Sequence, residues 1–356
     1  MHQGVVRKNG IVDNSQVITD PVALQIKAAD DGLHLDNFNP GNFEWWYFDI
    51  IEPETDCILK IVAHIGTDPL RRKFFSQIAL SVKTRTIKKA LSQLCQLDEF
   101  NAAHDKCNVK MTEQFHCYIK DGDYYIQLDI PGFSGEFTFT SQLPGWKPLG
   151  NEITIEKRKR SAAFGWIIPV PVATVNGTYI LNGHKYNLKN ASGYHDHNFW
   201  KVGQTNKLFI DDVISKWYWG RFTAADHTLI FMNTHFKDNQ ITSLYISDGK
   251  KLIHSSNNAV KFHIEQQKME QELNCSYPIK SVIRSIDSPE TLTLVIDTKE
   301  VIDRKDLLSG VNPILSWLIK TLVSRPAYIG LEAECYLTHA GQNIRGTGII
   351  ELMLFR

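Results

Sequence analysis

Runs of residues that alternate between apolar and polar constrain the fold of this 356-residue chain more than any other feature. Residues 57–65, 75–82 and 124–130 are rich in β-branched and aromatic side chains and are bounded by turn formers, as half-buried strands are. Asn-Gly or Asp-Gly in several turns between such runs suits a type I′ hairpin. The turn signals lie at 120–123, 181–184, 247–250 and 339–342. The chain is therefore predicted to be all-β, with up-and-down antiparallel connections.

Two segments depart from the strand pattern. Asn312 can cap a helix that begins at Pro313 and runs with helical apolar spacing to Ser324. A weaker amphipathic helical segment covers residues 87–97. Each half of the chain contains enough strand-like segments for one barrel or curved sandwich, so we place a domain boundary near residues 186–192. Barrels of this size can enclose one apolar ligand.

Charge and hydropathy exclude several classes of function. Lys plus Arg and Asp plus Glu both number 39, whereas nucleic-acid-binding chains normally carry a basic excess. The start of the chain lacks the apolar core of a signal peptide, and Pro169 and Pro171 interrupt the longest apolar stretch, 164–175. We therefore expect a cytoplasmic protein that does not bind nucleic acid. The six cysteines have no CxxC pair and are expected to be small buried hydrophobic residues.

The polar chemistry of the chain is concentrated in residues 194–200, which read Tyr-His-Asp-His-Asn-Phe-Trp. Two aromatic-rich segments, 44–49 and 216–222, share its character, and five of the eight tryptophans lie in these three places. Large flat apolar surfaces with a few ionisable groups are typical of a deep pocket for an apolar ligand. The partner we expect is an apolar small molecule.

Alternation in a strand divides each of these segments between two faces, because successive side chains point in opposite directions. Three sets share a face within their own strand: Tyr194, Asp196 and Asn198; His195, His197 and Phe199; Trp217, Trp219 and Arg221. Glu44 and Trp46 likewise share a face. The sequence leaves open which of these faces meet.

The three segments, in this order, resemble the carotenoid 1,2-hydratase (hydroxyneurosporene synthase) family, within the AttH-like superfamily of double-lipocalin proteins. Segments 164–169, 172–180, 325–328 and 346–356 are also similar, so the resemblance covers roughly residues 40–356. It implies an N-terminal extension over 1–39, lipocalin-like antiparallel barrel or sandwich domains over 40–188 and 189–356, and a ligand pocket associated with their junction. The superfamily also includes decalin-forming Diels–Alderases with a closely similar Tyr-His-Asp motif.

One position departs from the family pattern. Many relatives follow the His-Asn pair directly with Trp, whereas Phe199 here stands before Trp200. The aromatic contact made by that Trp in the family is therefore not carried over to this chain.

The first functional hypothesis is a hydratase. A buried carboxylic acid, Asp196, would protonate a carbon–carbon double bond of a polyene or isoprenoid, and water would add to the cation. His195 and His197 would orient the acid or manage its proton, and Tyr194 or Asn198 would position water. Three tryptophans would line the pocket: Trp46, Trp217 and Trp219. No cofactor is required.

The alternatives belong to other classes. A cyclase would fold the polyene and polarise a carbonyl through Glu44, His195 or Arg221. A binding protein would use the histidines and Asp196 only as a structural network. Glu44 and Arg221 could form an ion pair, since a buried carboxylate needs a partner. The pair His195-x-His197 could chelate a metal, although we expect none.

A transient membrane association stays open for the helix at 313–324, whose single Lys320 provides little basic surface.

Overall fold

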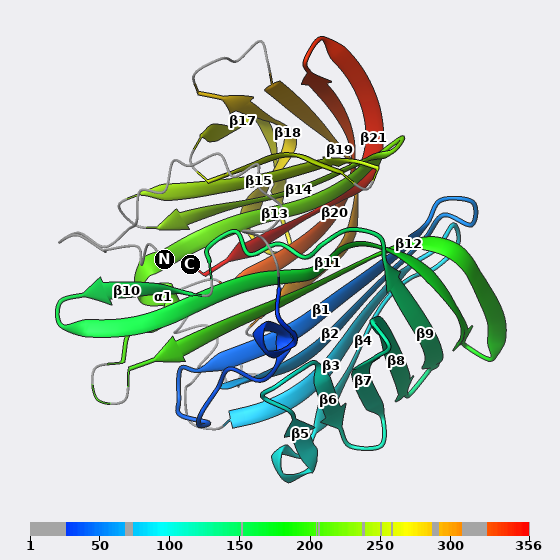
Figure 1. The fold of residues 1–356 in the computed structure, drawn as a ribbon, viewed down its shortest axis with the longest axis vertical. Helices are drawn as coiled ribbons and strands as arrows, with labels where there is room; N and C mark the ends of the chain where they lie inside the picture. Colours follow the sequence, from blue (N-terminus) through cyan, green and yellow to red (C-terminus); the bar gives the residue numbers. More distant parts are fainter. Residues whose placement is uncertain are drawn as a thin grey trace. The chain divides into compact units, whose positions relative to one another are not determined.

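The computed structural model describes residues 26–67, 74–150, 152–203, 205, 207–236, 239–249, 251–257, 259–286, 292–307 and 326–355. These residues form two compact units, an N-terminal unit within Pro21–Leu208 and a C-terminal unit within Phe209–Arg356. Each unit is built on one antiparallel sheet (Figure 1), which confirms the prediction of an all-β chain with two antiparallel domains. The helix expected at 313–324 lies outside the described residues.

The N-terminal unit contains a 12-stranded sheet in the order β4-β3-β2-β1-β12-β11-β9-β8-β7-β6-β5, with β10 paired to β11. The strands are β1 (Phe43–Glu52), β2 (Cys57–Thr67), β3 (Phe74–Lys83), β4 (Lys88–Cys95), β5 (Phe100–Ala102), β6 (Asn108–Met111), β7 (Phe115–Lys120), β8 (Asp123–Ile130), β9 (Phe133–Ser141), β10 (Ile153–Lys157), β11 (Arg160–Leu181) and β12 (His184–Val202). Two short 3₁₀ helices, η2 (Ala28–Asp31) and η3 (Leu97–Glu99), accompany them. The expected boundary between residues 188 and 189 falls within β12, which pairs with β11 on both sides of that point.

The C-terminal unit contains a nine-stranded sheet in the order β16-β15-β14-β13-β21-β20-β19-β18-β17. Its elements are α1 (Ile210–Val213), β13 (Ile214–Ala224), β14 (His227–Phe236), β15 (Gln240–Asp248), β16 (Lys251–Asn257), β17 (Val260–Glu270), β18 (Cys275–Ser285), β19 (Leu292–Asp306), β20 (Ala327–His339) and β21 (Gln342–Leu354). In both sheets a strand from the start of the unit pairs with the last strand of the unit, β1 with β12 and β13 with β21. Among the residues described, no helix is both long enough and apolar enough to cross a membrane.

The helix expected over residues 87–97 is wrong, because most of this segment forms β4, which pairs with β3. Ile87, Leu91 and Cys95 pack against the core of the N-terminal unit, while Leu94 is 65% exposed. A spacing of four residues places side chains on one face of a helix and also on one face of a strand. Apolar residues four apart, such as Ile87, Leu91 and Cys95, therefore fit a helix and a strand equally well, and the pattern alone did not distinguish the two.

The Asn-Gly and Asp-Gly turn signals join strands as predicted. The turns between β7 and β8 and between β11 and β12 have positive φ at both central residues, 53° and 90° at Asp121 and Gly122 and 52° and 81° at Asn182 and Gly183. This is the geometry of a type I′ turn. The third signal is shifted by one residue, because Asp248 itself pairs across the β15–β16 hairpin and Gly249 opens the turn.

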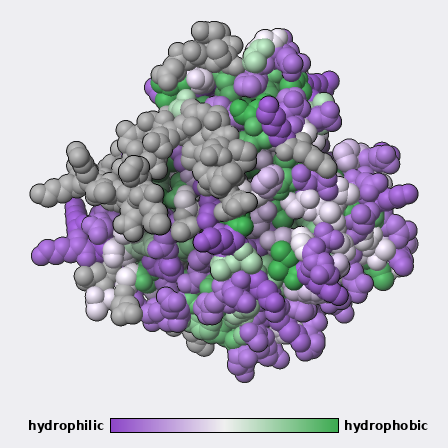
Figure 2. Space-filling view, in the orientation of Figure 1, coloured by the Kyte–Doolittle hydropathy of each residue, from purple (hydrophilic) through white to green (hydrophobic). Residues whose placement is uncertain are grey.

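Apolar side chains of both sheets are largely turned into the cores. On the face shown in Figure 2, hydrophobic residues form separate spots among hydrophilic ones. Four of the six cysteines are buried and two are partly buried, and all six are free thiols. Within the described part of the chain, the large apolar residues that are exposed are Phe38, Leu94, Ile180, Met269, Ile286 and Tyr336.

Candidate functional site

Strand pairing brings the first two sequence motifs together in the N-terminal unit. Strand β12 lies between β1 and β11 (Figure 1), and its pairing with β1 sets Trp46 opposite His197 and Tyr47 opposite Asp196. Residues directly opposite each other in an antiparallel pair point to the same face. The pairing therefore decides what the sequence left open: Glu44 and Trp46 share the face of the two histidines, and Asp196 lies on the other face.

His195 is fully buried in the core and contacts an aspartate that sequence reasoning missed. Its Nε2 lies 3.1 Å from Oδ2 of Asp31, which comes from η2, and its Nδ1 lies 2.9 Å from the carbonyl oxygen of Tyr47. The ring stacks on Phe48 with the centroids 4.1 Å apart. Asp31 also accepts a hydrogen bond of 2.8 Å from the hydroxyl of Tyr124.

His197 forms the second ionic contact of this face. Its Nε2 lies 2.7 Å from Oε1 of Glu44, and its Nδ1 lies 3.2 Å from Oδ1 of Asp31, out of line for a hydrogen bond. Glu44 also accepts hydrogen bonds from the backbone N–H groups of His34 and Leu35, at 2.8 and 3.0 Å. Glu44 thus finds hydrogen-bond partners within its own unit, and the ion pair with Arg221 suggested by the sequence stays a prediction.

The pKa values show how strongly these groups are coupled. Burial lowers the pKa of His195, but the effect of the nearby Asp31 carboxylate is stronger than that of burial and raises this pKa to about 10. In the same way, Asp31 and Glu44 overcome the burial of His197 and raise its pKa to about 9. Burial raises the pKa values of Asp31 and Glu44, yet the histidines hold both below the usual range. Two imidazolium groups and two carboxylates therefore compensate each other in the core.

The opposite face of β12 carries a different arrangement around Asp196, which is 4% exposed. Oδ2 of Asp196 accepts hydrogen bonds from the hydroxyl of Tyr194, at 2.8 Å, and from Nε1 of Trp166, at 3.2 Å. Oδ1 accepts one from Nδ2 of Asn198, at 2.9 Å. Sequence reasoning favoured His195 and His197 as the groups that orient Asp196, and this is wrong, because adjacent residues of a strand point to opposite faces.

Aromatic rings surround the Asp196 carboxyl group. Tyr194 meets Tyr47 edge to face with the ring centroids 6.1 Å apart, and Trp166 meets Trp146 in the same manner at 5.5 Å. Trp166 was not predicted as a site residue, although it stands opposite Asn198 in the β11–β12 pair. The signal available was its position in segment 164–169, which resembles the family. Three donors from aromatic and amide side chains thus fix the position of this buried carboxyl group.

The third motif lies on β13 of the C-terminal unit. Trp217, Trp219 and Arg221 share a face and are 8%, 6% and 1% exposed, while Tyr218 and Phe222 point into the core of that unit. The predicted division of this strand into two faces is therefore confirmed. Their contact with the same ligand as Asp196 stays a prediction.

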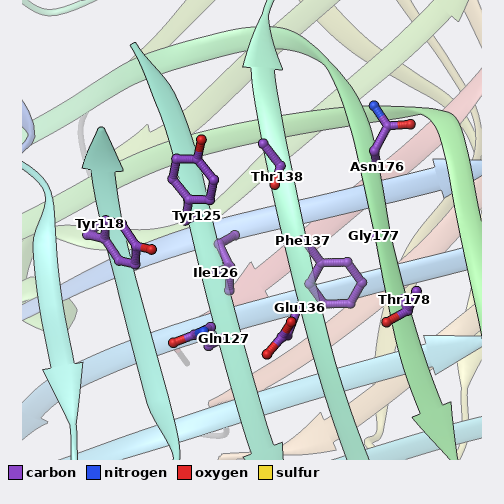
Figure 3. A pocket seen from close by; sticks show the side chains of 10 residues that line it. All are labelled: Tyr118, Tyr125, Ile126, Gln127, Glu136, Phe137, Thr138, Asn176, Gly177 and Thr178. Atoms are coloured by element: carbon purple, nitrogen blue, oxygen red, sulfur yellow. The ribbon is translucent and has the colours of Figure 1, made fainter. Parts of the chain in front are cut away.

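A shallow groove of about 260 Å³ lies elsewhere on the N-terminal unit (Figure 3). Tyr118, Tyr125, Glu136 and Asn176 line it from the neighbouring strands β7, β8, β9 and β11. The rings of Tyr118 and Tyr125 are stacked with the centroids 5.3 Å apart. The groove contains no residue of the three motifs, so it does not belong to the site around Asp196.

Comparison with known proteins supports the fold. No protein-family model and no curated protein matches the chain. An AttH-like protein from Nitrosomonas europaea superposes with a TM-score of 0.63 at 15% identity, covering 91% of this chain and 95% of that one. Kievitone hydratase from Nectria haematococca gives a TM-score of 0.58 at 8% identity, covering 96% and 97% of the two chains. CghA gives 0.60 at 11% identity, covering 98% of each chain.

These likenesses extend over nearly the whole length of each chain. They show that this chain has the same fold as these three proteins, among them an AttH-like protein and a hydratase, as the resemblance found in the sequence implies. At such identities the likeness concerns the fold.

Proposed function

We propose that this protein is an enzyme that acts on a carbon–carbon double bond of an apolar substrate, as a hydratase, with Asp196 as its reacting acid. The observation that carries the proposal is the buried Asp196 carboxyl group, held by Tyr194, Trp166 and Asn198 and surrounded by aromatic rings. One solved structure with this fold is named a hydratase, and another holds the compound Sch210972. Both support catalysis on organic small molecules.

The proposed reaction begins with transfer of a proton from Asp196 to one alkene carbon, which leaves a carbocation on the other carbon. The three hydrogen-bond donors stabilise the carboxylate left behind, and nearby aromatic faces stabilise the cation. Water then adds to the cation and returns one proton to the carboxylate. The sum is alkene plus water giving alcohol, with the acid restored.

The contacts of the other predicted residues support different roles. Tyr194 and Asn198 donate to Asp196 and thereby fix its position, and Trp166 joins them. His195 and Glu44, which a cyclase would use to polarise a carbonyl group, are engaged in the ionic network of the core. This engagement favours the hydratase over the cyclase.

Mass spectrometry with two probes tests the proposal: kievitone, and a linear isoprenoid with a terminal trisubstituted alkene. We expect a product heavier by one water, with one carbon-bound deuterium when the reaction runs in heavy water. Cyclisation would leave the mass unchanged, and tight binding of an unchanged probe after long incubation would favour a binding protein.

The variant Asp196→Asn separates the role of the acid from the fold. Loss of a general acid lowers the rate by about 10²- to 10⁴-fold, whereas the exposed Asp129→Asn of β8 should leave it unchanged. Circular dichroism checks that both variants are folded. Full turnover by a folded Asp196→Asn would show that another group supplies the proton.

A further inference from the structure

We propose that Asp31, Cys107 and His195 form a binding site for a thiophilic divalent cation such as Zn²⁺, with Cys117 as a fourth ligand. The site lies in the core of the N-terminal unit, on the side of β12 that the proposed reaction does not use. It is distinct from the arrangement His195-x-His197, because only one of those two histidines takes part.

Four potential ligands converge from separate parts of the N-terminal unit. Asp31 ends η2, Cys107 directly precedes β6, Cys117 lies on β7 and His195 on β12. All four are at most 2% exposed. One ligand atom each from Asp31, Cys107 and His195 lies within 4.8 Å of the other two, and the sulfur of Cys117 lies 3.6 Å from that of Cys107.

Two separations within the cluster are close to those of a tetrahedral zinc site. Zinc bonds of about 2.0 Å to nitrogen or oxygen and about 2.3 Å to sulfur place tetrahedral N and O ligands about 3.3 Å apart and two sulfurs about 3.8 Å apart. The observed values are 3.1 Å from His195 Nε2 to Asp31 Oδ2 and 3.6 Å between the sulfurs. Only small movements are needed at these two pairs.

Hydrogen-bond partners that do not themselves bind the metal orient two of the ligands, His195 and Asp31. The carbonyl oxygen of Tyr47 lies 2.9 Å from Nδ1 of His195, so a neutral ring carries its hydrogen on Nδ1 and directs the lone pair of Nε2 toward Asp31 and Cys107. The hydroxyl of Tyr124 donates to Asp31. Histidine and carboxylate ligands of metals are commonly fixed by such backbone and side-chain partners.

The charges of the site also fit a divalent cation. Without a cation, the proton on His195 balances the negative charge of Asp31, and the buried Cys107 is a neutral thiol. Binding of Zn²⁺ would release one proton from His195 and one from each of the two cysteines, which ligate as thiolates, so two positive charges replace three protons and the net charge of the buried site falls by one. Sulfur ligands favour Zn²⁺ over Mg²⁺ or Ca²⁺.

A second cluster of possible ligands, His34, Glu44 and His197, is a poorer candidate. Oε1 of Glu44 already accepts from the backbone N–H of His34 and lies 2.7 Å from His197 and 3.3 Å from the His34 ring. A metal bound there would displace hydrogen bonds of a carboxylate that is completely buried. In the Asp31 cluster a metal would displace the contact between Nε2 of His195 and Asp31, but Asp31 would keep the hydroxyl of Tyr124 as a donor, and the cluster offers sulfur ligands.

Metal analysis and Co²⁺ substitution test the site on the full chain after reduction of its thiols. We expect close to one Zn²⁺ per chain, and a sulfur-to-Co²⁺ charge-transfer band after exchange. Cys107→Ser should weaken Zn²⁺ binding at least about 100-fold. Losing a hydrogen-bond partner of a ligand already weakens binding by up to about 100-fold, and losing the ligand itself weakens it at least as much. Cys57→Ser, at a buried cysteine of the same unit, is the matched control and should bind normally.

Tyr124→Phe keeps the test informative if Cys107→Ser fails to fold. It retains all four ligands and removes only the hydroxyl that orients Asp31, so binding should weaken by about 10- to 100-fold. The proposal is overturned if the wild-type chain takes up neither Zn²⁺ nor Co²⁺. It is also overturned if the Co²⁺ spectrum lacks the sulfur band, or if a folded Cys107→Ser binds as well as the wild type.

Discussion

The substitution Glu44→Gln tests whether the ionic network of the N-terminal unit stabilises it. Glu44 is completely buried, and both of its oxygens accept hydrogen bonds from backbone N–H groups. An amide of the same size has only one oxygen. Its NH₂ group must therefore face a backbone N–H in either orientation, that of Leu35 or that of His34, and in the second orientation it also faces the ring nitrogen of His197.

The expected loss follows from these contacts. One buried donor without a partner costs about 1–3 kcal/mol, and removing one member of a buried ion pair costs about 3–5 kcal/mol in total. Asp31 remains 3.2 Å from Nδ1 of His197 and still compensates part of its charge. We therefore expect the free energy of unfolding of the N-terminal unit to fall by about 3 kcal/mol, near the lower end of that range.

Hydrogen exchange followed by mass spectrometry measures this loss within the affected unit. A loss of about 3 kcal/mol speeds exchange through opening of the unit about 100-fold. The faster exchange should appear in peptides from β1 and β12, with peptides from β20 unchanged. The control is Glu113→Gln, at a surface residue paired with Lys110, which should have no measurable effect. A loss below about 1 kcal/mol for Glu44→Gln would refute the view that breaking this buried pair is costly.

Two further predictions concern packing and pH. Gly193→Ala should destabilise the N-terminal unit by about 1–3 kcal/mol, because the added methyl group would collide with Val175 and Phe139; unchanged urea unfolding would contradict this. In the C-terminal unit, burial lowers the pKa values of His235 and His254 to about 4 from an ordinary value of 6.5. The unfolded chain therefore binds protons more tightly, so stability is full above about pH 6.5 and falls as the pH drops toward 4. Thermal unfolding at pH 7 and pH 5 measures the loss, and replacing both histidines by Gln should reduce it.

The sequence predicted which side chains of the central motif share a face, because strand alternation is local. It did not show that β1 pairs with β12, so Glu44 and Trp46 were grouped with Asp196 in one site. The register of two strands distant in sequence depends on the whole sheet and leaves no local signal. The same limit explains why Trp166 was missed, since only its pairing on β11 brings it to Asp196.

The assignment of residues 1–39 as an extension concealed Asp31, which lies in no periodic segment. A physical signal was nevertheless present. Two histidines that share a buried face need anionic partners, and the neighbouring motif offered only Glu44 on the same face as Trp46. A second carboxylate was therefore to be sought elsewhere in the chain.

The pairing of β1 with β12 has a consequence for synthesis of the chain. Glu44 and His197 are 153 residues apart, so at about 5–20 residues per second the ribosome needs roughly 8–30 s to make the partner strand after β1 is complete. During this time the apolar edge of β1 has only β2 beside it, and an unpaired edge attracts other chains. We expect newly made N-terminal fragments to require a chaperone until residue 202 has left the ribosomal tunnel.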